Sequence, residues 1–221
     1  MSSFCWRFTV EGQEDKDYLN QIYKLYGFPI PNILSAGGVN KFSGYLQFMN
    51  DYCSDMQKKP VVVVLYDKDS AGRSEFASLD SQKKKSNLSN IKIVNKYISK
   101  YDGTYPNDIE IEDFIPINIV VDAANKIIRK RSFSIIKSED KTKKSLPIYE
   151  KTPILKFLNE MCKLRNTDKS YQIDFETLEI KLLLCKNICN LLEYDKESQQ
   201  EIFDNIKIKQ FIKEVNANAG C

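Results

Sequence analysis

The chain has 221 residues, of which 42% are hydrophobic and 29% are charged. This length and composition support a sizeable core and argue against wholesale disorder. No apolar run approaches the roughly 20 residues that a membrane-spanning helix needs, and the N-terminal residues do not resemble a signal peptide. The six cysteines form no CxxC pair, so we expect a cytoplasmic protein with reduced thiols and no membrane partner.

Histidine is absent from the sequence. Its absence excludes serine–histidine and cysteine–histidine nucleophile systems, histidine-ligated metal nucleases and histidine acid–base catalysis. The sequence also carries no GxxxxGK[ST] phosphate-binding loop. Any catalysis therefore depends on carboxylates, lysine, tyrosine or a metal ion held by oxygen ligands. The net charge of +3 is too small to indicate a nucleic-acid partner by itself.

The first hundred residues alternate between patterns typical of strands and of helices, which predicts an α/β fold with a parallel sheet. In chain order we expect a strand over 4–10, a helix over 14–26, a strand over 32–36, a helix over 40–56, a strand over 61–66, a helix from about residue 73 and a strand over 91–98.

The central strand is the run of four valines, leucine and tyrosine over 61–66, which has the apolar β-branched composition of a strand buried on both faces. It ends in Asp67-Lys68-Asp69, and in an extended chain Asp67 and Asp69 point to the same side. Ligands of open α/β sheets bind at the carboxyl ends of the strands. Two carboxylates there suit Mg²⁺ or Mn²⁺, although a polar turn with two solvated aspartates is the simpler interpretation.

The first expected strand also ends in an acidic residue, Glu11, followed by Gly12. Asp15 lies one helical turn later and is a candidate for the same pocket, with an ordinary role at the helix N-terminus as the alternative. The pair Gly37-Gly38 either brings the backbone close to a ligand or forms a strand-to-helix turn.

Residues 109–114 alternate in polarity and predict a strand with Glu110 and Glu112 on one face. A helix is expected over 118–131, and the following residues to 149 read as a basic, serine-rich, exposed loop. Within 126–144 the candidate nucleic-acid contacts are Lys126, Arg129, Lys130, Lys141, Lys143 and Lys144, with a solvated surface as the alternative. From residue 150 onward the pattern is helical, with apolar faces over 155–164, 175–192 and 202–215.

The order of these motifs resembles the toprim domain shared by type II topoisomerases, primases and OLD-family nucleases. VEGQEDKDYL, which contains Glu11 and Asp15, is similar to the glutamate motif of the nuclease form. YDKDSAGR is similar to the toprim DxD motif, and IEIEDFIP to the later acidic motif of OLD-type nucleases and of toprim modules attached to some retron reverse transcriptases. The resemblance covers roughly residues 4–116.

The resemblance implies a nuclease that depends on one or two Mg²⁺ or Mn²⁺ ions and hydrolyses phosphodiester bonds of DNA or RNA. It assigns Glu11, Asp15, Asp67, Asp69 and Glu112 as metal ligands, Glu11 also to proton transfer, and Lys151 to stabilising the phosphate. OLD nucleases carry an ATPase domain upstream and this sequence begins at the first toprim strand. We therefore expect an antiviral defence effector that either works with a separate ATPase chain or acts as a standalone effector.

The expected organisation is a toprim-like catalytic domain over 1–130, a basic exposed loop over 131–149 and a helical extension over 150–221, which packs on the sheet or forms a homo-oligomer. Two other functions stay open. One is a toprim-fold module that binds Mg²⁺ without cutting. The other is a haloacid-dehalogenase-type phosphatase, which also places DxD after an apolar strand. Ala71 stands where that family has Thr or Val, and Glu11 precedes the motif, so the phosphatase fits less well.

Overall fold

The computed structural model describes residues 7–84, 88–98, 109–137, 152–170 and 172–219. The chain forms two compact units. The first, called here the sheet unit, comprises Met1–Ser99 and Ile206–Cys221, and the second, the helical unit, comprises Lys100–Asn205. The boundaries expected at residues 130 and 150 both fall within the helical unit, so the compact units and the predicted domains divide the chain differently.

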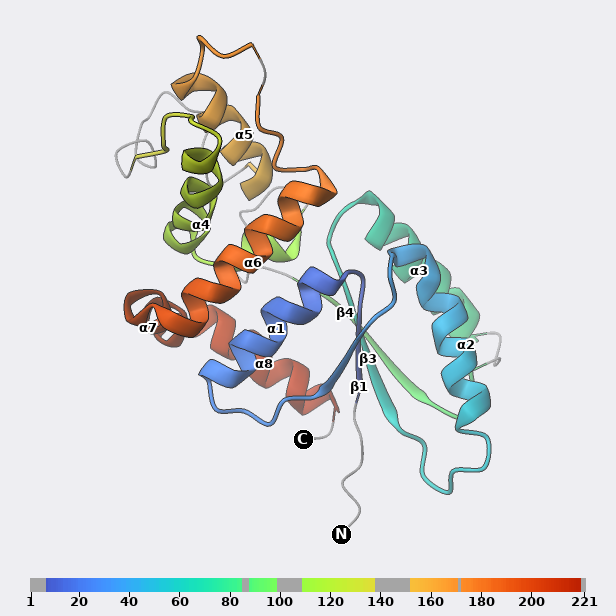
Figure 1. Cartoon of the computed structure of the whole chain (residues 1–221). Coiled ribbons are helices and arrows are strands. Elements are labelled where there is room, and N and C mark those ends of the chain that lie inside the picture. The colour runs from blue at the N-terminus through green and yellow to red at the C-terminus, as the bar shows by residue number, and fades with distance from the viewer. Residues whose placement is uncertain (1–6, 85–87, 99–108, 138–151, 171, 220–221) are drawn as a thin grey trace. The chain divides into compact units, whose positions relative to one another are not determined.

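The sheet unit contains four parallel strands in the order β2-β1-β3-β4 (Figure 1). They are β1 (Arg7–Val10), β2 (Asn32–Ser35), β3 (Val61–Tyr66) and β4 (Lys92–Tyr97). Each parallel connection needs a crossover, and helices supply it. The result is the predicted α/β, Rossmann-like parallel sheet flanked by helices, with a helical C-terminal part.

One face of the sheet packs against α1 (Gln13–Leu25) and α8 (Ile206–Ala219), as Figure 1 shows. The ring of Phe8 on β1 meets that of Tyr23 on α1 edge-on, with centroids 5.8 Å apart. The Tyr23 hydroxyl donates to the Asn216 side-chain oxygen on α8 at 2.6 Å. Lys96 on β4 pairs with Glu214 on α8 at 2.6 Å. The last helix of the chain is therefore an integral layer of the sheet unit.

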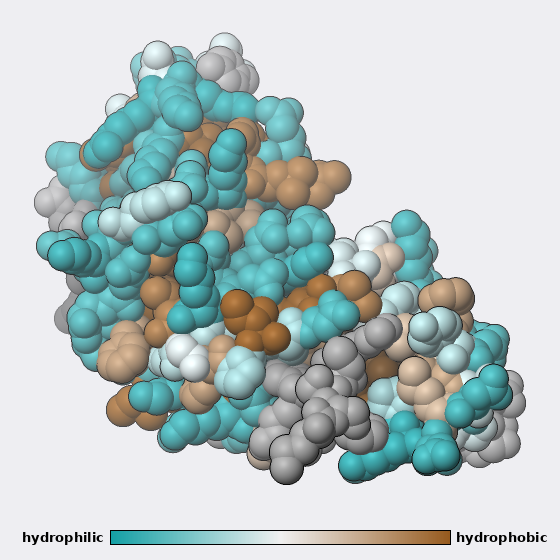
Figure 2. Space-filling model, turned by 60° about the horizontal axis from the view of Figure 1, so that its bottom comes forward, coloured by the Kyte–Doolittle hydropathy of each residue, from teal (hydrophilic) through white to brown (hydrophobic). Residues whose placement is uncertain are grey.

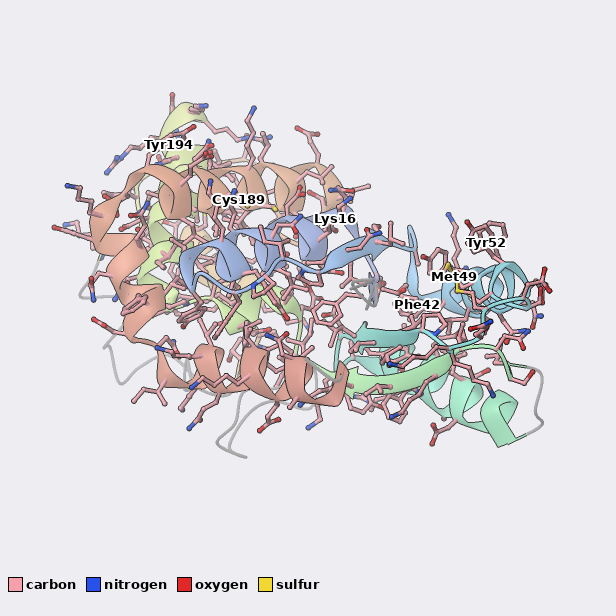
Figure 3. The ribbon with its side chains drawn as sticks, turned by 90° about the horizontal axis from the view of Figure 1, so that it is seen from below. Lys16, Phe42, Met49, Tyr52, Cys189 and Tyr194 are labelled. Atoms are coloured by element: carbon pink, nitrogen blue, oxygen red, sulfur yellow. The ribbon has the colours of Figure 1, made fainter. Side chains whose placement is uncertain are left out.

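The opposite face packs against α2 (Phe42–Tyr52), which follows the 3-10 turn η1 (Val39–Lys41), and against α3 (Ser70–Lys84). The shared core comprises Phe42, Leu46, Met49, Cys53, Val62, Val64, Tyr66, Leu79 and Ile91. The odd and even residues of β3 thus face different helix layers, which explains why every residue from Val62 to Tyr66 is apolar or aromatic. In Figure 3, Phe42 lies toward the strands and Tyr52 lies on the outer side of α2.

The helical unit contains the 3-10 turn η2 (Ile111–Phe114) and four α-helices among its described residues. These are α4 (Ile117–Lys130), α5 (Ile154–Arg165), α6 (Leu178–Tyr194) and α7 (Lys196–Asp204). The apolar face expected over 202–215 is not one helix. It is divided at Asn205, whose extended backbone (φ −76°, ψ 95°) separates α7 from α8.

Residues 131–137, the first part of the expected exposed loop, contain no helix or strand, and Ser132, Ser134 and Lys137 are exposed, but two of their apolar side chains are not. Phe133 and Ile136 are buried. The buried Asn125 side chain exchanges two hydrogen bonds of 2.9 Å with the backbone of Ile136. Asn166 accepts from the Ser134 backbone N–H at 2.6 Å. The side-chain amides of Asn125 and Asn166 thus supply the hydrogen-bond partners that a helix or a strand would otherwise give this backbone. Residues 138–149 of the expected loop lie outside the described part of the chain.

The face shown in Figure 2 is mainly hydrophilic, with apolar residues in small groups between polar ones. Apolar exposure on this scale is usual for a globular protein. In the part of the chain that the structure describes, no helix combines the length and the apolar character needed to cross a membrane.

Candidate functional site at the carboxyl edge of the sheet

Glu11 and Asp67 follow directly after two neighbouring strands. β1 and β3 pair in parallel, with Thr9 opposite Val64, so their carboxyl ends lie at the same edge of the sheet. β1 is therefore the direct neighbour of the central strand β3. We call Glu11, Asp67 and Asp69 the acidic edge; all three side chains are half-buried.

The acidic edge lies where the strand order reverses. From β1 the chain crosses to β2 on one side, whereas from β3 it continues to β4 on the other. The first crossover helix, α1, and the last, α3, cover opposite faces of the sheet (Figure 1). In open α/β sheets such a reversal leaves a crevice outside the carboxyl ends of the strands, and ligands bind there. The acidic residues therefore follow the two strands that border this position.

Asp69 begins the helix α3. Its Oδ1 accepts from the Gly72 backbone N–H at 2.6 Å, which is the hydrogen bond of an N-cap residue. The helix consequently starts at Ser70, three residues before the start predicted near Arg73. A Cβ atom on Gly72 would lie 2.1 Å from the Asp67 carbonyl oxygen. The spacing Asp-x-Asp-x-x-Gly thus has a local structural reason, because the helix turns tightly against the end of β3.

The end of β1 is fixed by the glycine pair. The backbone N–H groups of Gly37 and Gly38 both donate to the Glu11 carbonyl oxygen at 3.0 Å. Their φ angles of +74° and +128° lie in the region that favours glycine. These donors face the protein's own backbone, which supports the strand-to-helix turn over direct ligand contact. The glycine pair therefore positions Glu11.

Asp15 serves the N-terminus of α1. It is 5% exposed, and its Oδ2 accepts from the Gly12 backbone N–H at 2.7 Å. This is the helix N-terminal role that the sequence left open. An ionised carboxylate has acceptor sites on both oxygens, so this capping role is compatible with a role as a metal ligand.

The strand predicted over 109–114 is absent from the structure, which places the 3-10 turn η2 there. Asp113 causes the turn: its Oδ2 accepts from the Glu110 N–H at 3.1 Å and its Oδ1 from the Ile154 N–H at 2.8 Å. One side chain thus closes η2 and joins it to the first turn of α5. The predicted common strand face of Glu110 and Glu112 is wrong for the same reason.

The two glutamates of this segment have different surroundings. Glu112 is 2% exposed. Glu110 is partly exposed and pairs with Lys181 on α6, with 2.5 Å between Nζ and Oε2. Both belong to the helical unit, and the predicted role of Glu112 as a metal ligand stays a prediction.

The predicted basic contacts divide into two groups. Lys126, Arg129 and Lys130 lie toward the C-terminal end of α4 in the helical unit, where Arg129 and Lys130 are exposed. The pKa of Asp195 is lowered by hydrogen bonds from Ser198 and, to a smaller extent, by the charge of Lys126. Half-buried Lys126 therefore lies near an acidic side chain of the same unit. The other predicted cations, Lys141, Lys143, Lys144 and Lys151, lie outside the described residues.

The pattern-based prediction missed a group of aromatic and basic side chains beside the acidic edge. Tyr66 and Tyr97 end β3 and β4 and pair in register, and Phe76 of α3 stacks on Tyr97. Burial, and secondarily the Glu75 carboxylate, raises the pKa of Tyr66 far above its ordinary value, so its hydroxyl stays protonated. The signal in the sequence was an aromatic residue at the end of each of two neighbouring strands.

The acidic edge fits a divalent cation by its donor chemistry, since carboxylate oxygens are the ligands that Mg²⁺ and Mn²⁺ prefer. Over the described ranges, no three acidic or cysteine side chains converge as a ready metal-binding group.

Comparisons with family models, with curated proteins and with solved structures found no match for this chain. The class of protein is accordingly defined by its own geometry. It is an α/β protein with a Rossmann-like parallel sheet and acidic residues where the strand order reverses.

Proposed function

We propose that this protein is a nuclease that depends on Mg²⁺ or Mn²⁺ and hydrolyses phosphodiester bonds of DNA or RNA. The observation that carries the proposal is the position of Glu11 and Asp67 directly after the adjacent parallel strands β1 and β3. Ligand sites of open α/β sheets lie there, and the absence of histidine leaves carboxylates as the main acid–base and metal-binding groups.

The residues of the acidic edge have distinct roles in this proposal. Asp67 and Asp69 hold the cation, and Asp69 is itself held at the N-terminus of α3. Glu11 completes the ligand set and accepts or returns a proton. Asp15 contributes through the oxygen that does not cap α1. A bound divalent ion would supply an activated water and would stabilise charge on the leaving oxygen.

The remaining parts of the proposal come from the resemblance to OLD-type toprim nucleases. They are Glu112 as a further ligand, Lys151 as the cation that stabilises the phosphate, and a separate ATPase chain as partner in antiviral defence. The basic residues Lys126, Arg129, Lys130, Lys141, Lys143 and Lys144 would bind the nucleic-acid backbone. A cytoplasmic location and a homo-oligomer formed through the C-terminal helices belong to the same proposal.

Glu11→Gln tests the proposed activity, because the change removes the charge but keeps the size of the side chain. Cleavage of plasmid DNA and of total RNA should fall by about 10²-fold or more in Mg²⁺ or Mn²⁺. The matched control is Glu14→Gln, on the first turn of α1, which should cleave as the wild type does. The assay should include any ATPase encoded beside this chain. Undiminished cleavage by a folded Glu11→Gln protein would overturn the assignment.

A non-cleaving Mg²⁺-binding module is a second function that the same carboxylates at the ends of β1 and β3 would allow. Both functions predict a higher melting temperature in Mg²⁺ than in EDTA, and loss of that gain in Asp67→Asn. A melting temperature unaffected by metal would count against both. Metal-dependent stabilisation without cleavage of any DNA or RNA would favour the binding module.

A further inference from the structure

Two aromatic rings stack beside the acidic edge. The centroids of Phe76 on α3 and Tyr97 on β4 are 4.4 Å apart, and the ring planes differ by 13°. Tyr66 closes the inner side of the pair, with its ring 5.4 Å from Phe76 and 6.2 Å from Tyr97. Tyr66 is completely buried, whereas the two stacked rings are only half-buried. Because Tyr66 precedes Asp67 and pairs with Tyr97, the stack lies at the same end of the sheet as the acidic edge.

An exposed cation lies next to this stack. Arg73 is three residues before Phe76 on α3, so the two side chains share a face of the helix. Its guanidinium donates to the Lys68 carbonyl oxygen, within the acidic loop, at 2.9 Å. Its charge also acts on Tyr97: burial raises the pKa of the Tyr97 hydroxyl, and Arg73 opposes that rise. One guanidinium therefore lies close to both the loop that carries Asp67 and Asp69 and the aromatic pair.

Phe76 and Tyr97 pack at the border of the core that Phe42, Tyr66 and the apolar residues of α2 form on this face of the sheet. Part of each stacked side chain nevertheless stays exposed to solvent. Stacked rings with partly exposed surface next to a guanidinium are the usual elements of a single-strand binding site. There a base adds to the aromatic stack while the cation contacts an adjacent phosphate.

We propose that Phe76, Tyr97 and Arg73 bind an unpaired nucleotide next to the acidic edge, so that the substrate is single-stranded or locally unpaired nucleic acid. The inference rests on the proposed nuclease function and narrows its substrate class. The base stacks on the aromatic pair through its flat face, which every base has, so the site does not select a nucleotide sequence. A base inside a duplex has both faces covered by its neighbours and cannot stack in this way. Arg73 then places the adjoining phosphate beside the carboxylates.

The experiment measures binding separately from cleavage. The probe is a fluorescently labelled single-stranded oligothymidine with one 2-aminopurine, in EDTA at low salt. Wild-type protein should bind it, quench the 2-aminopurine by stacking, and bind the matching duplex more weakly. Phe76→Leu and Tyr97→Leu should remove the quenching and weaken binding about tenfold. Tyr97→Phe keeps the ring and should behave as the wild type. Arg73→Gln should weaken binding and lower the salt slope by about one.

Two variants of the sheet unit serve as matched controls. Tyr52→Leu removes an exposed ring from the outer side of α2, and Lys92→Gln removes an exposed cation from the opposite end of β4. Both should leave quenching unchanged. Tyr97 is half-buried, so its variants need a melting temperature close to that of the wild type. If the Tyr97 variants unfold, Arg73→Gln still tests the proposal, because Arg73 is exposed and its replacement leaves the core intact.

The outcomes separate this inference from the proposed nuclease function. Three outcomes would overturn the inference. In the first, the wild type binds no oligonucleotide; in the second, folded Tyr97→Leu and Phe76→Leu proteins quench as the wild type does; in the third, the duplex binds as tightly as the single strand. Cleavage that depends on Glu11 would still support the nuclease in each case. Conversely, ring-dependent quenching without cleavage under any metal condition would support the nucleotide site and contradict the nuclease.

Discussion

Asp67-Lys68-Asp69 and Glu110-Ile111-Glu112-Asp113 both place carboxylates at alternate positions, yet the protein uses them differently. The first segment continues a buried parallel strand and leaves two half-buried acids at the edge of the sheet. The second is a 3-10 turn in which Asp113 binds backbone N–H groups on both sides. In this chain, alternating acids follow the end of a strand where an apolar β-branched run precedes them, and they form a turn where it does not.

The largest expected difference between the two segments is in catalysis. Asp67→Asn should lower cleavage by about 10²-fold or more, because it removes a charge from the acidic edge. Glu110→Gln, the matched change in the second segment, should leave cleavage within about twofold, because Glu110 pairs with Lys181 in the helical unit. The measurement is the initial rate of cleavage of one substrate by both folded variants. Equal losses would contradict the separation of roles.

The next difference concerns stability. Asp113→Ala leaves two backbone N–H groups without their acceptor and should destabilise the protein by roughly 2–4 kcal/mol. Asp113→Asn keeps one side-chain acceptor and should lose less. Urea denaturation followed by circular dichroism measures both values. A loss below about 0.5 kcal/mol for the alanine variant would show that the contacts of Asp113 contribute little.

Gly72→Ala tests the tight turn that ends the acidic edge. Its Cβ would meet the Asp67 carbonyl oxygen at 2.1 Å, so the backbone must shift, at a cost of about 1–3 kcal/mol. Cleavage should fall as well, because Asp67 and Asp69 move with this backbone. Gly44→Ala in α2 is the control: its Cβ meets no atom within 4 Å, and the change should stabilise the helix by up to about 1 kcal/mol. Similar effects of the two changes would contradict the close packing at Gly72.

The smallest effect is expected for the ion pair of the second segment. The side chains of Lys181 and Glu110 are 22% and 30% exposed, so solvent screens their attraction. Lys181→Met should cost about 0.5–1 kcal/mol. A double-mutant cycle with Glu110→Gln measures the coupling directly. A coupling energy near zero would show that the pair is incidental.

The sheet was largely predictable because each strand has a strong local signal. The apolar run over Val61–Tyr66 and the alternation of strand and helix patterns were enough to place all four strands and to predict that they are parallel. The start of α3 was misplaced because Asp69 was considered as a metal ligand and not as an N-cap. Both roles use the same carboxylate, and the sequence alone does not separate them.

The helical unit was less predictable for a physical reason. Its irregular segments are held by hydrogen bonds between residues far apart in the sequence, in which the backbone N–H groups of Ile136, Ser134 and Ile154 donate to the side chains of Asn125, Asn166 and Asp113, respectively. No periodic pattern encodes a bond of this kind. The Phe76–Tyr97 stack was missed likewise, because its members lie on different elements and meet only after the sheet has formed.

The return of α8 to the sheet unit has a consequence for synthesis on the ribosome. Roughly 100 residues of the helical unit are made between β4 and α8, which takes about 5–20 s at typical elongation rates. During that interval α1 can already cover its part of this face, but the part that α8 covers, including Lys96 beside Phe211, lacks its native layer. The strands are therefore translated before the helical unit and receive their last helix only after it, so a ribosome stalled before Ile206 would leave the part of the sheet that α8 covers exposed to chaperones.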